Sequence, residues 1–302
     1  MTTKSRKSPD EIKNLLEGPV TSIPTPFLSN GDIDWDGVGN IIEIGIGGGS
    51  GVILLTAGDS QYFCLSEDEI AQLTQFTIER TAGRALTIAA TGAWPTRQAE
   101  AFAHRCIEWG ADALMSVTTF HGSDPEGVAN HNAAISKIIP VMLVGYPSHR
   151  ALDMLIDEPN ICCFKEDGDT AYAVETLQKY GHHWKIMTGG TLWRHLLEWP
   201  FGCTTFMDWS TSFAPHIGSE FHQALCRNDI AEARRITVEI ERPLWDLRPN
   251  FRGDWQTMWR AILELYGVSA RYLRSPQLSA TKKDMEFLRA SLNQIGLLPK
   301  KH

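Results

Sequence analysis

The stretch NICCFKEDGD, residues 160–169, runs through four apolar positions into Lys165 and then into an acidic turn that contains Gly168. A short run that is apolar at every position, and not only at every second one, is typical of a strand buried on both faces, as in a parallel sheet. Glycine and aspartate favour the turn that follows. The stretch therefore predicts a buried parallel strand that carries an ammonium group at its carboxyl end.

Seven other short apolar runs share this character. Together with the first, they predict eight strands at residues 19–25, 51–55, 85–92, 113–119, 140–146, 160–166, 184–189 and 203–209. Segments of helical periodicity lie between several of them, at residues 65–83, 96–110, 124–138 and 170–181. The first of these segments opens with Ser66 and acidic residues and ends near Gly83, which are ordinary signals for the start and end of a helix.

Eight strands that alternate with helices predict an α/β protein with the (β/α)8 TIM-barrel fold. A doubly wound open sheet is the alternative, but it usually has fewer strands and a glycine fingerprint after the first one. After residue 209 only helical patterns remain, at residues 214–241, 254–266 and 282–294. We therefore predict a barrel over residues 1–212 and a C-terminal helical segment over residues 213–302 that packs on it.

The composition argues against several classes of protein. The net charge of −8 argues against nucleic acid or an anionic membrane as the main partner, because both require a concentrated basic face. The longest apolar runs are far shorter than the ~20 residues of a membrane span, and the N-terminus has no apolar signal-peptide core. The 6 cysteines form no CxxC pair, so we interpret them as reduced core residues of a cytoplasmic protein.

The glycine-rich run GIGGGSG, residues 45–51, invites comparison with a phosphate-binding loop. It lacks the Gly-Lys-Ser/Thr ending of such loops, and it precedes a predicted strand instead of following one. A helix-to-strand turn that needs positive φ angles is the favoured interpretation.

Lys165 is the first candidate catalytic residue. In a barrel the carboxyl ends of the strands form the active site, and apolar neighbours there disfavour the charged form of an amine. A neutral amine can attack a ketone and form a Schiff base. From these residues alone, a lysine that snorkels to water or pairs with Glu166 or Asp167 is an equal alternative.

Five segments together resemble one enzyme family. They are GPVTSIPTPFLSNGDID, GVILLTAGDSQYFCLSEDE, VMLVGYPSHR, CCFKEDGD and IMTGG, which begin at residues 18, 51, 141, 162 and 186. In this order they are similar to the pyruvate-dependent class I aldolase family of dihydrodipicolinate synthase and N-acetylneuraminate lyase. The resemblance covers nearly the whole chain. It implies a (β/α)8 barrel with a C-terminal helical segment, assembled as a homo-oligomer, either a dimer or a tetramer.

The resemblance also implies roles for individual residues. Lys165 falls on the family's Schiff-base lysine and would condense with the keto group of pyruvate or of a larger 2-keto acid. The loop of Thr56, Ala57 and Gly58 would hold the substrate carboxylate through backbone N–H groups and the Thr56 hydroxyl.

Two further positions match the family at the ends of the seventh and eighth strands. Gly189 matches a glycine where the backbone approaches the substrate, and Met207 matches an apolar position that packs over the imine. Because the lysine itself supplies the electron sink, the resemblance implies that neither a metal nor an organic cofactor is needed.

Departures from the family's pattern bear on proton transfer. The family has two adjacent threonines and a glutamate in the loop after the second strand, where this chain has Ala57 and Asp59. Val144 stands where the family has its proton-transferring tyrosine. Tyr146 lies two residues further on, so strand alternation directs it to the same side, about 7 Å nearer the barrel mouth, and makes it a candidate acid/base. A packing tyrosine at a strand end is the alternative.

Another departure follows the fourth strand, where a tyrosine pair of the family is replaced by Phe120 and His121. Histidine titrates near neutrality, so His121 is a second candidate for proton transfer, with a solvated loop histidine as the alternative. His149 stands near an arginine that some members use to bind a distal carboxylate. Without that arginine at this position, the aspartate-semialdehyde substrate of lysine biosynthesis is less favoured, although Arg150, next to His149, leaves that point open.

The leading hypothesis is a carbon–carbon or carbon–oxygen lyase of the class I aldolase type, similar to dihydrodipicolinate synthase, that acts on a small 2-keto acid. The second is a catalytically altered paralogue that binds a keto acid as a sensor or partner protein, and it is motivated by Ala57 and Val144. The third is a barrel enzyme that uses no Schiff base.

Overall fold

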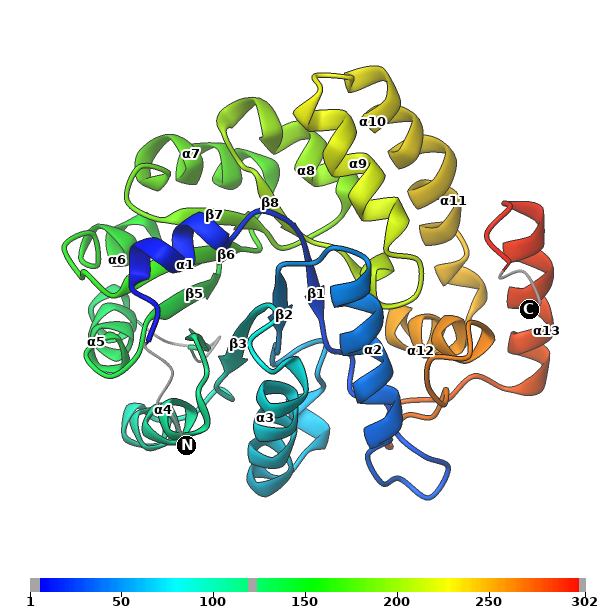
Figure 1. The fold of residues 1–302 in the computed structure, drawn as a ribbon, viewed down its shortest axis with the longest axis horizontal. Helices are drawn as coiled ribbons and strands as arrows, with labels where there is room; N and C mark the ends of the chain where they lie inside the picture. Colours follow the sequence, from blue (N-terminus) through cyan, green and yellow to red (C-terminus); the bar gives the residue numbers. More distant parts are fainter. Residues whose placement is uncertain (1–5, 119–123, 299–302) are drawn as a thin grey trace.

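Eight parallel strands close into a barrel whose order around the axis follows the order of the chain (Figure 1). The computed structural model describes residues 6–118 and 124–298. The strands are β1 (Gly18–Ser22), β2 (Val52–Leu54), β3 (Leu86–Ala90), β4 (Ala113–Ser116), β5 (Val141–Gly145), β6 (Ile161–Glu166), β7 (Lys185–Thr188) and β8 (Thr205–Met207). Each overlaps one of the eight predicted segments, so the prediction of a (β/α)8 barrel is confirmed.

Helices follow the strands on the outside of the barrel. They are α2 (Trp35–Gly47), α3 (Glu67–Thr81), α4 (Thr96–Trp109), α5 (Pro125–Ser136), α6 (His149–Asp153), α7 (Thr170–Tyr180), α8 (Leu192–Glu198) and α9 (His216–Cys226). The predicted start of α3 is confirmed, because Ser66 Oγ accepts from the Glu69 N–H and the Glu69 carboxylate accepts from the Ser66 N–H. These two bonds satisfy amides that a helix start otherwise leaves without partners.

Strand β6 is buried at all six of its positions. Its edges pair with β5 and β7, and α1 (Pro9–Leu15) packs against it. Every residue from Ile161 to Phe164 is at most 1% exposed, which explains why the run is apolar without alternation. Burying one large apolar side chain of this kind contributes roughly 1.5–3 kcal/mol to stability.

The glycine-rich run forms the turn between α2 and β2. Gly48 caps the end of α2, and Gly49 has a φ of +91°, a left-handed conformation that glycine adopts without strain. Ser50 Oγ accepts a hydrogen bond from the Thr21 N–H, which joins the turn to β1. The interpretation of this run as a helix-to-strand turn is confirmed.

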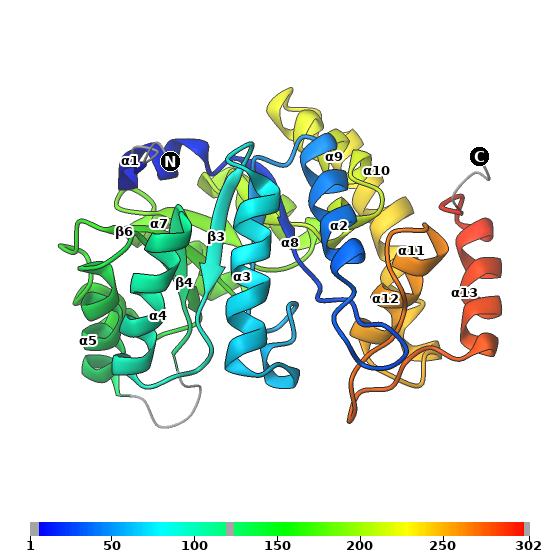
Figure 2. The ribbon, with the colours of Figure 1, turned by 60° about the horizontal axis from the view of Figure 1, so that its bottom comes forward.

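Helices beyond the barrel pack along one of its sides (Figure 2). They are α10 (Ile230–Ile236), α11 (Arg242–Trp245), α12 (Trp255–Leu265) and α13 (Lys282–Gln294), with a π-helical turn over Thr237–Glu241. The pattern predicted over residues 214–241 is divided, because Asn228 has a φ of +56° and Asp229 caps α10. Helix α9 packs beside β1, and the boundary between residues 212 and 213 stays a prediction.

All six cysteines are free thiols. Four are buried, Cys64 is partly exposed, and Cys226 is exposed. The interpretation as core residues is therefore wrong for Cys226, the last residue of α9, whose side chain meets solvent. Across the described residues, no helix has the length and apolar character needed to cross a membrane.

Candidate active site

Lys165 lies at the carboxyl end of β6, in the mouth of the barrel. It is 6% exposed, and its Nζ donates a hydrogen bond to Asp167 Oδ1 at 2.5 Å. Because side chains alternate along a strand, Glu166 points to the opposite side, where it pairs with Arg194. The sequence left open whether Lys165 pairs with Glu166 or with Asp167, and in the structure its partner is Asp167.

A cavity of about 180 Å³ opens beside the amine. It is lined by Thr56, Ala57, Gly58, Asp59, Met115, Val117, Thr118, Val144, Gly145, Lys165, Asp167 and Met207. These residues lie at or just beyond the carboxyl ends of β2, β4, β5, β6 and β8, which is where barrel enzymes place their chemistry. The cavity thus brings together five predicted site residues: Thr56, Ala57, Gly58, Lys165 and Met207.

The loop after β2 forms a cradle of backbone amides at one wall of the cavity. Thr56 Oγ1 accepts from the Asp59 N–H at 2.9 Å, and the Thr56 N–H donates to Ser60 Oγ at 3.2 Å. The amides of Ala57 and Gly58 donate to no acceptor among residues 6–118 and 124–298. These two amides and the hydroxyl proton of Thr56 are therefore the donors available to a carboxylate.

Arg260 of α12 supports this loop from the C-terminal segment. Its guanidinium is fully buried, and Nη2 donates to the backbone oxygens of Asp59 at 3.0 Å and Thr25 at 3.4 Å. The Asp59 carboxyl group is buried as well. Burial raises its pKa, while the Ser22 hydroxyl and the charges of Lys165 and Arg260 lower it.

Gly189 follows β7 and lies directly against the amine. A Cβ atom there would lie 1.9 Å from Asp167 Oδ1, 2.7 Å from the Glu166 carbonyl oxygen and 2.9 Å from Lys165 Nζ. Only a residue without a side chain fits beside the ion pair. The structure thus gives a steric reason for the glycine that the sequence singled out.

Tyr146 does not line the cavity, and it is 66% exposed. The alternation that directed it toward the barrel mouth ends at Gly145, whose φ is +98°. Val144, in contrast, lines the cavity and lies in register beside Lys165 on the neighbouring strand. The position nearest the amine on β5 therefore carries a side chain that cannot transfer a proton.

The remaining predicted residues lie elsewhere. His121, with Phe120, falls outside the described residues, so its role stays a prediction. His149 begins α6 and stacks on Tyr172 at 5.1 Å between ring centroids, away from the residues that line the cavity. Arg150, the alternative carboxylate partner, is exposed.

A buried polar network lies on the other side of β6 and β7. We define this outer network as Glu166, Thr188, Arg194, His195 and Glu198. Arg194 pairs with both glutamates, and the Thr188 hydroxyl donates to Glu198 at 2.5 Å and contacts His195 Nδ1 at 2.9 Å. Burial raises the pKa of Glu166 against the pull of Arg194, and burial lowers the pKa of His195 to about 3.

The outer network also contributes to a possible metal-binding cluster. Ligand atoms of His195, Glu198 and Cys203 lie within 4.8 Å of one another. The Thr188 hydroxyl contacts all three side chains, and the Arg194 cation is bound to Glu198. An adjacent cation opposes a second positive ion, so these residues fit a hydrogen-bond network better than a metal site.

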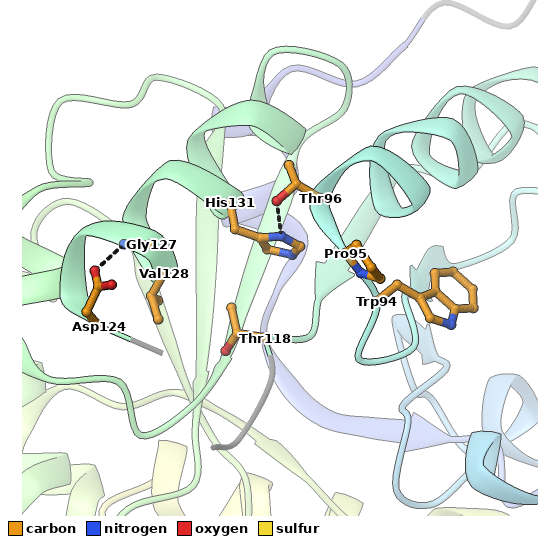
Figure 3. Close-up of a pocket in the computed structure, with 8 residues that line it drawn as sticks. All are labelled: Trp94, Pro95, Thr96, Thr118, Asp124, Gly127, Val128 and His131. Atoms are coloured by element: carbon orange, nitrogen blue, oxygen red, sulfur yellow. Dashed lines mark hydrogen bonds between the residues drawn. The ribbon is translucent and has the colours of Figure 1, made fainter. Parts of the chain in front are cut away.

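A second cavity, of about 220 Å³, lies between α4 and α5 and shares Thr118 with the first (Figure 3). Thr96 Oγ1 and His131 Nδ1 face each other at 3.0 Å, and Asp124 is bound to the Gly127 N–H. The cavity has no amine in its lining and none of the predicted site residues that the structure describes. The cavity beside Lys165 is therefore the candidate active site.

Fold and site together define a class of protein: a (β/α)8 barrel with a buried primary amine at the end of its sixth strand, beside a cradle of backbone amides. The chain belongs to the dihydrodipicolinate synthetase family, whose model matches residues 15–295. The resemblance stated from the sequence is confirmed. Members of this family are lyases and dehydratases of the class I aldolase type.

Two curated relatives illustrate the range of the family. A 4-hydroxy-tetrahydrodipicolinate synthase from Pseudomonas aeruginosa is 27% identical, over 94% of this chain and 100% of its own length. A probable 5-dehydro-4-deoxyglucarate dehydratase from Variovorax paradoxus is 25% identical, over 96% of this chain and 99% of its own length.

Two solved structures share the fold. Dihydrodipicolinate synthase from Oceanobacillus iheyensis superposes with a TM-score of 0.86 at 18% identity, covering 95% of this chain and 99% of that one. N-acetylneuraminate lyase from Fusobacterium nucleatum superposes with a TM-score of 0.83 at 18% identity, covering 93% and 99%.

Proposed function

We propose that the protein is a Schiff-base-forming lyase, an aldolase or a dehydratase, that acts on pyruvate or a related 2-keto acid. The observation that carries the proposal is one small cavity lined by Lys165 and by Ala57 and Gly58, two residues whose amides have no backbone acceptor among the described residues. A 2-keto acid has a carboxylate next to its carbonyl carbon. The amides would hold the carboxylate while the carbonyl carbon faces Nζ.

The chemistry follows from the amine. Attack of Nζ on the keto carbon and loss of water give an iminium ion, which withdraws electrons from the neighbouring bonds. It allows either removal of a proton from C3 or cleavage of the C3–C4 bond. Met115 and Met207 line the cavity with apolar atoms, and the Lys165 side chain is nearly closed to bulk water.

The relatives include a synthase and a dehydratase, and both fit this chemistry. In line with the family, we further propose that the chain works as a homo-oligomer, a dimer or a tetramer, in the cytoplasm. Size-exclusion chromatography with light scattering measures the assembly directly.

A second candidate function is the altered paralogue that binds a keto acid without turnover. Val144 favours it, because this position beside Lys165 offers no hydroxyl for proton transfer. The two candidates differ in one observable, which is exchange of the C3 protons of pyruvate with solvent.

The test is borohydride reduction in the presence of pyruvate, followed by intact mass measurement and peptide mapping. The expected result is a pyruvyl adduct on Lys165 that is absent in Lys165→Ala. Lys179→Ala is the matched control, because its amine is half-exposed and pairs with Asp153 on the surface. Absence of an adduct with pyruvate and with longer 2-keto acids would contradict the proposal.

A further inference from the structure

We infer that Asp167 is the acid/base residue of this active site, in place of the tyrosine that the family has at the position of Val144. The inference rests on the proposed function, because it assigns a proton carrier to the Schiff-base chemistry of Lys165. It also answers the difficulty that Val144 raises for catalysis.

The first observation is contact with the reacting atom. Asp167 Oδ1 lies 2.5 Å from Lys165 Nζ, within hydrogen-bond reach of the nitrogen that would attack the ketone. The carboxylate also lines the cavity, so it faces a substrate bound to Nζ. Its side chain is 31% exposed, which lets it exchange protons with solvent between steps.

The second observation is that the carboxylate is held in place. The Asp167 N–H donates to the Gly145 carbonyl at 2.9 Å, which ties the turn after β6 to the end of β5. On the side of β7, Gly189 leaves only enough room for a hydrogen atom next to Oδ1. Backbone at the carboxyl ends of both neighbouring strands therefore holds Asp167 beside the amine.

The third observation concerns the competing groups. Among the described residues that line the cavity, only Asp59, Lys165 and Asp167 carry ionisable side chains. Asp59 approaches from the loop after β2 and is buried, and burial raises its pKa. The neighbouring ends of β5 and β7 present Gly145 and Gly189 and add no charge, while Tyr146 is turned out to solvent.

The proton steps balance with this single carboxylate. A proton moves from the Lys165 ammonium to Asp167, which leaves a neutral amine and a carboxylic acid. The amine forms a bond to the keto carbon, and the proton that the nitrogen then releases passes to the keto oxygen. The C–O bond breaks, Asp167 protonates the leaving hydroxyl to water, and the nitrogen lone pair forms the C=N bond. The regenerated carboxylate can then remove a proton from C3 to give the enamine.

The experiment compares C3 proton exchange of pyruvate in D₂O, followed by NMR, with borohydride trapping on Lys165. Asp167→Asn is expected to slow exchange by about 10²–10⁴-fold, the usual contribution of a positioned acid/base. An adduct on Lys165 should still accumulate during long incubation. The acidic limb of the pH profile for exchange should disappear in Asp167→Asn and remain in Asp167→Glu.

Asp169→Asn is the matched control. It removes the next carboxylate of the same turn, which is exposed and caps α7, a position that asparagine also fills well. This variant should keep the exchange rate and the pH profile of the unmodified protein. If Asp167→Asn fails to fold, Asp167→Ser carries the same test.

Three results would overturn the inference. The first is C3 proton exchange near the unmodified rate in a folded Asp167→Asn or Asp167→Ser variant. The second is loss of exchange in Tyr146→Phe while Asp167→Asn keeps it, and the third is borohydride trapping without exchange in the unmodified protein. A different result, no adduct at all in the unmodified protein, would reject the proposed function and the inference with it.

Discussion

The two sides of β6 carry neighbouring charged residues in very different surroundings. On the inner side, Lys165 pairs with Asp167 beside a cavity. On the outer side, Glu166 accepts from the Gly168 N–H and pairs with Arg194, which in turn holds Glu198. Both Lys165 and Glu166 are buried, so burial alone does not distinguish the proposed nucleophile from a structural charge.

What distinguishes them is the space and the number of partners around each group. The inner pair, Lys165 and Asp167, is joined by one hydrogen bond and lies beside an open cavity that a substrate carbonyl can enter. None of the outer-network residues lines either of the two cavities described above, and its glutamates are fully buried against one shared cation. Changes in the outer network should therefore act on stability, and changes in the inner pair should act on chemistry.

The largest effect on stability is expected from Arg194→Met. Removal of this cation leaves the buried carboxylates of Glu166 and Glu198 without a counter-charge, which should cost about 3–5 kcal/mol of unfolding free energy. Urea denaturation followed by circular dichroism measures the loss. Arg242→Met is the control, because its ion pair with Asp246 is exposed and should contribute at most about 1 kcal/mol. Equal losses of unfolding free energy in Arg194→Met and Arg242→Met would contradict the proposed stabilising role of the outer network.

Gly189→Ala tests the position where the inner pair and the backbone of Glu166 approach each other. The added methyl would overlap Asp167 Oδ1 and crowd the Glu166 carbonyl oxygen, so we expect a loss of about 3 kcal/mol, the upper range for overpacking. Trapping of pyruvate on Lys165 should also decline, because the ion pair must move. Gly47→Ala is the control, since nothing lies within 4 Å of its added methyl. An active and stable Gly189→Ala protein would show that the ion pair has more room than the structure gives it.

His195 predicts how the outer network responds to acid. The folded protein lowers its pKa from 6.5 to about 3 through burial, so the unfolded chain takes up a proton first as the pH falls. The stability that depends on neutral His195 is therefore present above pH 6.5 and should fall by about 2 kcal/mol between pH 7 and pH 5. In His195→Gln, the difference between the unfolding free energies at pH 7 and pH 5 should be smaller by about 2 kcal/mol. An unchanged difference would mean that His195 does not account for the acid sensitivity.

The smallest stability effect is expected at Lys165, the proposed catalytic lysine. Lys165→Met should change the unfolding free energy by less than about 1 kcal/mol, because Asp167 is partly exposed and can be solvated once its partner is gone. The same variant should form no pyruvate adduct. Thermal unfolding and mass measurement on one preparation check both statements, and a loss comparable to that of Arg194→Met would contradict the comparison.

Much of this architecture could be predicted from the sequence, because buried parallel strands require apolar residues on both faces. The run from Ile161 to Phe164 has that composition, and the strand lies where the run predicts it. Position at a strand end was also enough to single out Lys165. The choice between Glu166 and Asp167 as its partner was available in principle, since residues two apart share one side of a strand.

Tyr146 shows where the sequence argument failed to place a side chain. The same rule of alternation directed it to the same side of the strand as Val144, but that rule applies only as far as the strand continues. Gly145 adopts a φ of +98°, and the tyrosine lies largely exposed to solvent. A glycine in the sequence shows that such a turn can form at that position. It does not determine which backbone conformation the fold adopts there.

The buried guanidinium of Arg260 has a consequence for how the protein matures during synthesis. It holds the loop proposed to bind the substrate carboxylate through the Asp59 carbonyl, 201 positions earlier in the chain. A ribosome that has released only the first 212 residues has already produced every strand and Lys165, the proposed nucleophile, yet the support for that loop has not been made. Catalytic competence should therefore appear late, when α12 docks, so that an incomplete nascent chain carries its nucleophile without an ordered place for substrate.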